Sequence, residues 1–207
     1  MRPMPQSYNV TLLIFVAVLF VVGAVFGGLM VHALTLEQQE DLADEVARYI
    51  GQFGSNAAAA GDSDAFWSRL LFHGKWLLLV WVLGVTVVGV PFVLALDFLK
   101  GALVGFAVGT LVSEHSWKGV LLSLVSVAPP NLITVPAILM ASVASLSFSL
   151  YVVNNRLLRQ RGPLAPQLIS FTASTAIMLA LLAGAALLET YVSPVLIGWV
   201  APMFASS

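Results

Sequence analysis

The sequence predicts an all-α polytopic membrane bundle with about five transmembrane helices, and three observations lead to this fold class. Of the 207 residues, 59% are hydrophobic and 9% charged, whereas a soluble domain is about 45–50% apolar and about 25% charged. The apolar residues gather in uncharged runs of about 20 residues, the length that crosses a bilayer. The formal net charge of −1 argues against a nucleic-acid partner, which needs a basic face. Residues 1–207 therefore read as a single integral-membrane domain.

The first three spans are predicted at residues 10–31, 76–96 and 98–117, and the first two contain no charged residue. The first run alone holds 22 residues, a helix of about 33 Å, which is enough for one crossing. Asp97 and Lys100 fall where the second span gives way to the third. Because charged side chains are costly inside lipid, we expect them to form an ion pair at a membrane surface.

Glycines recur at four-residue spacing in the first and third predicted spans. They are Gly23, Gly27, Gly101, Gly105 and Gly109. Residues four apart lie on one helix face, and small side chains there let two helix backbones approach closely in lipid. This pattern predicts a helix-packing surface, either inside one bundle or between copies of the chain in a homo-oligomer such as a dimer.

The polar segment 35–75 lies between the first two predicted spans and contains seven acids and three bases. Thr35 and Gln38 have the spacing of a capping box, which starts a helix. Apolar residues then recur at helical spacing on this acidic helix, and we call them the outer stripe: Leu42, Val46, Tyr49, Ile50 and Phe53. Residues 54–61 are predicted to form a connector. A second short helix begins at Asp64, and we expect it to lie at the membrane surface.

The longest uncharged run, residues 119–152, must be broken before it crosses the membrane. Its 34 residues would form a straight helix of about 51 Å, against a hydrocarbon core of about 30 Å. Pro129 and Pro130 supply the structural break. We expect a short re-entrant or interfacial helix before them and the fourth span at residues 131–152. Asn131 either lines a substrate path at this break or caps the following helix.

The fifth span is predicted at residues 167–188, after a basic loop at residues 153–163 that contains three arginines. Basic loops stay in the cytoplasm, and counting spans back from this loop also places the N-terminus there. The acidic segment 35–75 and the C-terminus are then extracytoplasmic. Residues 192–204 are apolar but short, so we expect them to lie in the interface.

Sequence motifs for catalysis or cofactor binding were not found. The chain has no cysteine, and its three histidines, His32, His73 and His115, lack the spacing of a zinc site. Neither a nucleophile elbow nor a phosphate loop occurs. The predicted spans carry almost no ionisable residue at depth, as a proton-coupled pump would need, and Asp97 with Lys100 is the nearest candidate for such a relay. We therefore expect no enzyme activity, no cofactor and no metal.

A series of short motifs over residues 66–150 resembles the stage II sporulation protein M family. The motifs are Phe72-His73, Trp81-Val82-Leu83-Gly84, Gly89-Val90-Pro91, Phe98-Leu99-Lys100-Gly101, Gly105-Phe106-Ala107-Val108-Gly109, Pro130-Asn131, Pro136 and Ser147-Phe148-Ser149. Phe26-Gly27-Gly28 in the first span also fits, so the resemblance covers nearly the whole chain.

The resemblance implies a non-catalytic, multi-pass scaffold in the mother-cell membrane at the engulfing septum of an endospore-forming cell. It implies recruitment of two peptidoglycan-degrading enzymes, stage II sporulation proteins D and P. Such partners meet the scaffold on its outer side, so we expect the outer stripe to bind them as a helix in a groove. The alternative is that the stripe packs on its own bundle or on lipid. The competing class is a small homodimeric transporter or permease, with a path near Pro129–Asn131 lined by Asn131, Ser126 and Thr134.

Overall fold

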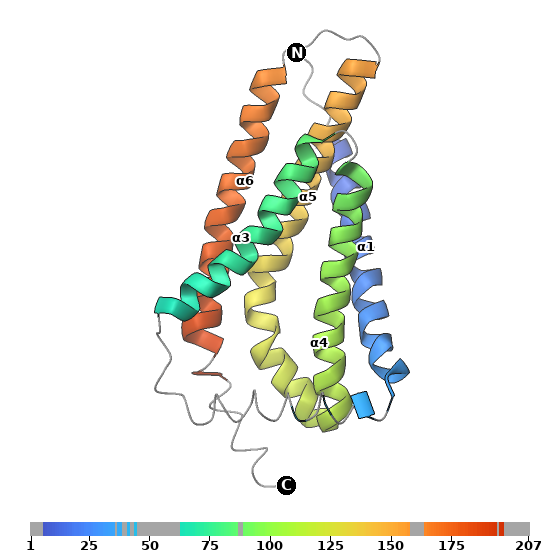
Figure 1. Cartoon of the computed structure of the whole chain (residues 1–207), viewed down its shortest axis with the longest axis vertical. Coiled ribbons are helices and arrows are strands. Elements are labelled where there is room, and N and C mark those ends of the chain that lie inside the picture. The colour runs from blue at the N-terminus through green and yellow to red at the C-terminus, as the bar shows by residue number, and fades with distance from the viewer. Residues whose placement is uncertain are drawn as a thin grey trace.

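The protein consists of long helices that run roughly along one direction (Figure 1), here described from a computed structural model. The structure describes residues 6–35, 37–38, 41, 44, 63–86, 89–157, 164–193 and 195–196. The elements are α1 (Gln6–Met30), the 3-10 turn η1 (Val31–Ala33), α3 (Ser63–Val85), α4 (Gly89–Ser126), α5 (Ala128–Leu157), α6 (Leu164–Leu187) and the π-helical segment η3 (Leu188–Val192).

Five of the described helices are long and apolar enough to cross a membrane, which confirms the predicted fold class. The membrane-crossing stretches are Val10–Ala33, Phe66–Val85, Gly89–Ser113, Ala128–Val153 and Leu164–Val192. No strand occurs among the residues that the structure describes. The chain is thus an all-α polytopic bundle.

The boundary between the second and third spans lies earlier in the chain than predicted. Helix α3 already begins at Ser63 and ends at Val85, and α4 begins at Gly89. The Thr86 hydroxyl donates a hydrogen bond of 2.8 Å to the carbonyl of Leu83, and the Gly89 amide donates one of 3.0 Å to the carbonyl of Thr86. These bonds satisfy the backbone where the chain turns back, so no polar loop is needed there. The prediction that Asp97 lies at a membrane surface is therefore wrong.

The break near Pro129 is present, but it is a tight turn between two long helices. Helix α4 runs on to Ser126, Val127 forms the turn, and α5 begins at Ala128. The predicted separate helix at residues 119–128 is therefore wrong, because these residues end α4 and start α5. Pro129 and Pro130 lie in the first turn of α5, where a backbone N–H is not required.

Helices α1 and α4 approach each other so closely that their glycines contact the partner backbone. An added Cβ at Gly23 or Gly27 would collide with the carbonyl of Phe98 or Ala102. On α4, a Cβ at Gly101 or Gly105 would meet the carbonyl of Phe20 or Ala24, and Gly109 lies against Gly28 and Val31. The two glycine faces therefore lie against each other within one chain.

Helix α5 forms the centre of the bundle. In its most apolar stretch 56% of the residues are buried, against 17–28% in the other four spans. Serines on α5 fix α3 in place: Ser145 donates a hydrogen bond of 3.1 Å to the carbonyl of Val80, and Ser149 one of 2.7 Å to that of Gly84. Phe148 stacks on Phe171 of α6 with ring centroids 5.2 Å apart. These contacts position α3 and α6 around α5.

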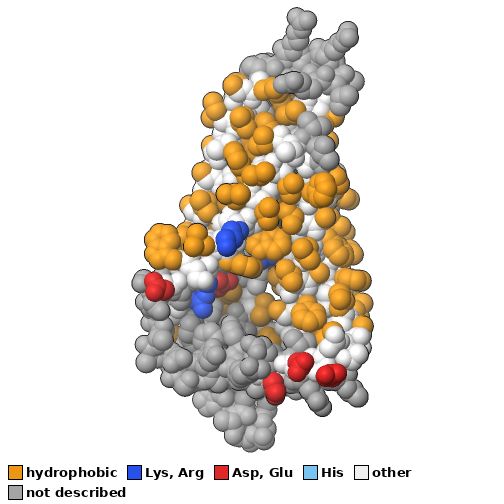
Figure 2. All heavy atoms as spheres, in the orientation of Figure 1, with side chains coloured by type: hydrophobic (Ala, Val, Ile, Leu, Met, Phe, Trp, Pro, Cys, Tyr) orange, Lys and Arg blue, Asp and Glu red, His pale blue; other side chains and the backbone are white. Residues whose placement is uncertain are grey.

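The sequences that adjoin the two ends of the bundle differ in charge. Figure 1 shows the start of α1, the end of α3, the end of α5 and the start of α6 at one end, and η1, the α4–α5 turn and the end of α6 at the other. Three arginines lie in the sequence at and directly after the end of α5, whereas the described residues after η1 include the exposed acids Glu37, Asp41 and Asp44. Between the ends the visible face is largely apolar (Figure 2), as expected for a lipid-facing surface.

We expect Gly105→Ala to destabilise the bundle by about 1–3 kcal/mol, because its Cβ collides with the Ala24 backbone and forces α1 away from α4. Gly184→Ala is the matched control, since nothing lies within 4 Å of the Cβ that it adds. Alanine is the better helix former, so the control should be neutral or stabilising by up to about 1 kcal/mol. Reversible unfolding in mixed detergent, followed by circular dichroism, measures both. Equal stabilities would contradict the close α1–α4 contact.

Candidate functional site

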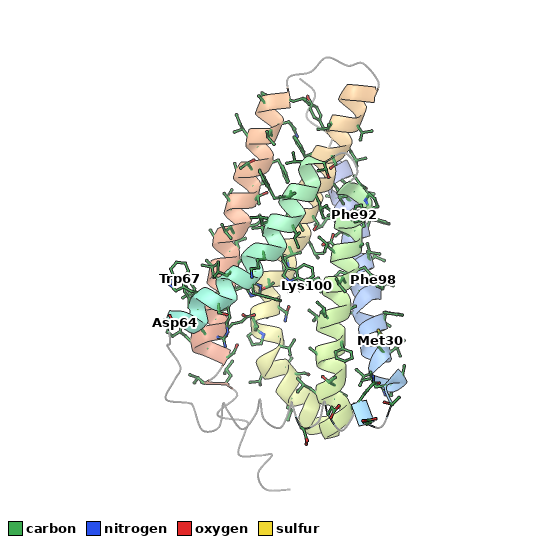
Figure 3. The ribbon with its side chains drawn as sticks, viewed as in Figure 1. Met30, Asp64, Trp67, Phe92, Phe98 and Lys100 are labelled. Carbon is green, nitrogen blue, oxygen red and sulfur yellow. The ribbon has the colours of Figure 1, made fainter. Side chains whose placement is uncertain are left out.

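Ionisable side chains lie inside the bundle where α3, α4, α5 and the end of α6 meet, and Lys100 marks this place in Figure 3. We define the polar cluster by the described residues Arg69 and His73 on α3, Asp97 and Lys100 on α4, Ser142 on α5, and Glu189 and Ser193 at the end of α6. The expectation that the spans carry almost no ionisable residue at depth is therefore wrong. Intramembrane ionisable residues are rare and mark functional sites by default.

Asp97 is buried between α4 and α5. It lies eight residues after the first residue of α4, so the helical rise places it about 12 Å from the start of that helix. Its side chain is only 1% exposed. The Ser142 hydroxyl donates a hydrogen bond of 2.7 Å to Oδ1, while Oδ2 has no hydrogen-bond partner. Asp97 is thus an interior carboxyl group, where a surface position was predicted.

Lys100 follows Asp97 by one turn of α4 but turns toward α3. Its Nζ lies 5.3 Å from the ring centroid of Phe72 and 5.4 Å from that of Trp76, which is cation–π geometry. The side chain is 7% exposed. Among the described residues, the contacts of Asp97 include no bond to Lys100, so the predicted interfacial ion pair is wrong. The two residues are instead held by different neighbouring helices.

His73 and Glu189 join α3 to the π-helical segment that follows α6. Nε2 of His73 lies 3.2 Å from Oε2 of Glu189, and the side chains are 5% and 25% exposed. Nδ1 of His73 is buried without a hydrogen-bond partner. Glu189 lies in η3, and π-helical turns are frequent at functional sites because they re-aim side chains. The sequence alone does not reveal this pair, because the two residues are 116 positions apart.

Two further polar groups lie one helical turn beyond this pair. Arg69 precedes His73 by four residues on α3, and Ser193 follows Glu189 by four residues in the chain. Nη1 of Arg69 and Oγ of Ser193 are buried and have no hydrogen-bond partner. The cluster therefore extends toward the end of the bundle where α6 ends. The i, i+4 spacing of Arg69 and His73 was the one sequence signal that could have indicated it.

The residues predicted at the break do not belong to the polar cluster. The Asn131 side-chain amide donates a hydrogen bond of 2.8 Å to the carbonyl of Val127, so it bridges the turn between α4 and α5. Thr134 is buried, and its Oγ1 has no hydrogen-bond partner. The side chain of Ser126 lies outside the described residues.

On the acidic side, the predicted capping box is confirmed. The Thr35 amide donates to Oε1 of Gln38 at 3.1 Å, and the Gln38 amide donates to Oγ1 of Thr35 at 3.4 Å. Glu37, Gln38, Asp41 and Asp44 have helical backbone. All five residues of the outer stripe lie outside the described residues, so their role stays a prediction.

The histidines are dispersed. His32 is exposed on η1, His73 belongs to the polar cluster, and the side chain of His115 lies outside the described residues. Within the part of the chain that the structure describes, no three histidine, aspartate, glutamate or cysteine side chains are grouped to hold a metal ion.

Five apolar helices around a small charged interior define a polytopic helical membrane protein. The sequence profile of the Stage II sporulation protein M family matches residues 16–194, from within α1 to just beyond Glu189. The chain therefore belongs to this family of sporulation-related membrane proteins, which are generally non-catalytic. No curated protein and no solved structure matches the chain.

We expect the His73–Glu189 contact to contribute about 0.6–1.7 kcal/mol to stability, the range of hydrogen bonds between membrane helices. A double-mutant cycle of His73→Ala and Glu189→Ala isolates this coupling when unfolding is measured in mixed detergent. The more exposed Trp81–Thr172 hydrogen bond of 3.4 Å serves as the control, and its coupling should be smaller. A His73–Glu189 coupling no larger than that of the control would show that the pair does not hold α3 to η3.

Proposed function

We propose that this protein is a non-catalytic membrane scaffold that recruits peptidoglycan-degrading enzymes, stage II sporulation proteins D and P, during forespore engulfment. The observation that carries the proposal is the family match over residues 16–194. The internal packing of the helices is consistent with an anchor, because hydrogen bonds and backbone contacts within one chain hold α1, α3, α4 and α5 together. The lipid bilayer surrounds this anchor, in the mother-cell membrane under this proposal.

The acidic end of the bundle is the side on which such partners would bind. Wall-degrading enzymes act outside the membrane, and the positive-inside rule places the arginine-rich α5–α6 connection in the cytoplasm. The turn η1, which follows α1, lies at the opposite end of the bundle (Figure 1), and the sequence from there to α3 is the longest stretch between two of the spans. This stretch carries the outer stripe in its sequence. A partner would recognise this stripe as the apolar face of an amphipathic helix.

Recruitment should depend on residues 36–62, which lie between the capping-box threonine and α3. We expect both enzymes to co-purify with the intact chain in detergent, and to be lost when this segment is replaced by a Gly/Ser linker of equal length. The replacement stops before Ser63, because α3 begins there and must stay intact. Capture that survives the replacement would place docking elsewhere.

Within that segment, Leu42→Glu together with Val46→Glu should abolish capture, because a charged group cannot enter an apolar groove. Asp41→Asn is the control in the same segment, because Asp41 is exposed and is not part of the outer stripe. Correct insertion of each variant is checked by its yield and its elution profile in detergent. Equal capture by the double variant and the control would contradict a docking role for the outer stripe.

The proposed orientation can be tested with single cysteines, because the natural chain contains none. We expect Asp41→Cys to react with a membrane-impermeant maleimide on intact cells, and Arg159→Cys to react only after the membrane is permeabilised. The reason is that Asp41 belongs to the acidic end and Arg159 to the basic connection. The reverse pattern would move the outer stripe into the cytoplasm and exclude contact with wall enzymes.

Transport is the second candidate, and the polar cluster is the observation that favours it. Ionisable residues inside a membrane bundle commonly line solute or ion pathways. The path predicted near Asn131 receives no such support, because that side chain is bonded to its own turn. A transport pathway would instead pass Asp97 and Lys100. Uptake of a solute by liposomes that contain the purified protein, lost in Asp97→Asn, would favour this class over the scaffold.

A further inference from the structure

Asp97 is a buried carboxyl group that lacks a partner for one of its oxygens. Oδ1 accepts the Ser142 hydrogen bond, and Oδ2 accepts none, although the side chain is only 1% exposed. An ionised carboxylate normally accepts hydrogen bonds at both oxygens, and an unpaired charge inside a membrane bundle is strongly unfavourable. A carboxylic acid that holds a proton fits this environment better than the anion does.

Among the residues that the structure describes, no cation forms an ion pair with Asp97. Lys100 is its neighbour on α4, but the ammonium group faces the Phe72 and Trp76 rings. The other ionisable residues of the cluster are Arg69 and His73 on α3 and Glu189 in η3. Helix α1 contains no charged residue, and the only one in α5 is Arg156 near its C-terminal end. The 3-10 turn η1 contributes His32, which is exposed.

The polar cluster forms a graded sequence from the surface to the interior. The side chain of Glu189 is 25% exposed, that of His73 is 5% exposed, and Asp97 is 1% exposed. One ring nitrogen of His73 contacts Glu189, and the other is buried without a partner. The His73–Glu189 pair is thus the more exposed part of the polar cluster, and Asp97 is its most buried carboxyl group.

We propose that Asp97 is an intramembrane proton-binding site. During uptake, a proton from water binds Oδ2 of Asp97 while Oδ1 keeps the Ser142 hydrogen bond, and the carboxylate becomes a neutral carboxylic acid. Release returns the proton to water, and no bond between heavy atoms changes. This site goes beyond the scaffold role and requires no partner protein.

Infrared spectroscopy of the purified, lipid-reconstituted protein tests the site. We expect a C=O stretching band of a protonated carboxylic acid that titrates with pH in the natural protein and is absent in Asp97→Asn. The matched control is Asp64→Asn, which removes an exposed aspartate at the start of α3 and should keep the band. A titrating band that is the same in Asp97→Asn and in the natural protein, or the absence of any such band, would overturn the proposal.

A milder variant tests the site even if Asp97→Asn fails to fold. Ser142→Ala removes the hydrogen bond to Oδ1, so the band should shift to higher wavenumber, and an unchanged band would overturn the assignment to Asp97. This readout is independent of enzyme recruitment, so it separates this proposal from the scaffold role.

Discussion

A charged group inside a bilayer has no water to solvate it. Helix α4 carries both Asp97 and Lys100 in a stretch that is apolar enough to cross a membrane. The other helices must therefore enclose this part of α4. Ser142 of α5 bonds Asp97, and the aromatic rings of α3 cover Lys100. Helix α1 covers another part of α4 through the glycine contacts, where neither backbone leaves room for lipid. Much of the arrangement of the bundle can be understood as the covering of α4.

This arrangement separates two parts of the molecule that would serve different purposes. Side-chain hydrogen bonds and glycine contacts hold the interior helices at defined positions. The segment between η1 and α3 is rich in acids in its sequence, which suits contact with a partner outside the bilayer. A scaffold needs both a fixed anchor and an accessible recognition segment. The polar cluster adds ionisable side chains to the interior of the bundle, which anchoring alone does not require.

Local patterns were sufficient to predict the fold class, the number of spans, the proline break and the Thr35–Gln38 capping box. They were insufficient for the α3–α4 turn, because the residues around Thr86 are apolar and the turn satisfies its backbone by internal hydrogen bonds. Once that turn was missed, Asp97 and Lys100 were assigned to a surface. The His73–Glu189 pair depends on tertiary contacts between residues far apart in sequence, which hydropathy does not encode.

Cross-linking of Asp97→Cys to Ser142→Cys tests most directly whether the charged part of α4 faces α5, and the chain has no other cysteine to interfere. A short, membrane-permeant bifunctional thiol reagent should link the two cysteines within one chain in high yield, because the natural side chains lie 2.7 Å apart. Leu99→Cys with Ser142→Cys should link poorly, since Leu99 is exposed on α4. Efficient cross-linking of Ser142→Cys to Leu99→Cys, with none to Asp97→Cys, would mean that Asp97 faces away from α5. This result would contradict the buried polar cluster.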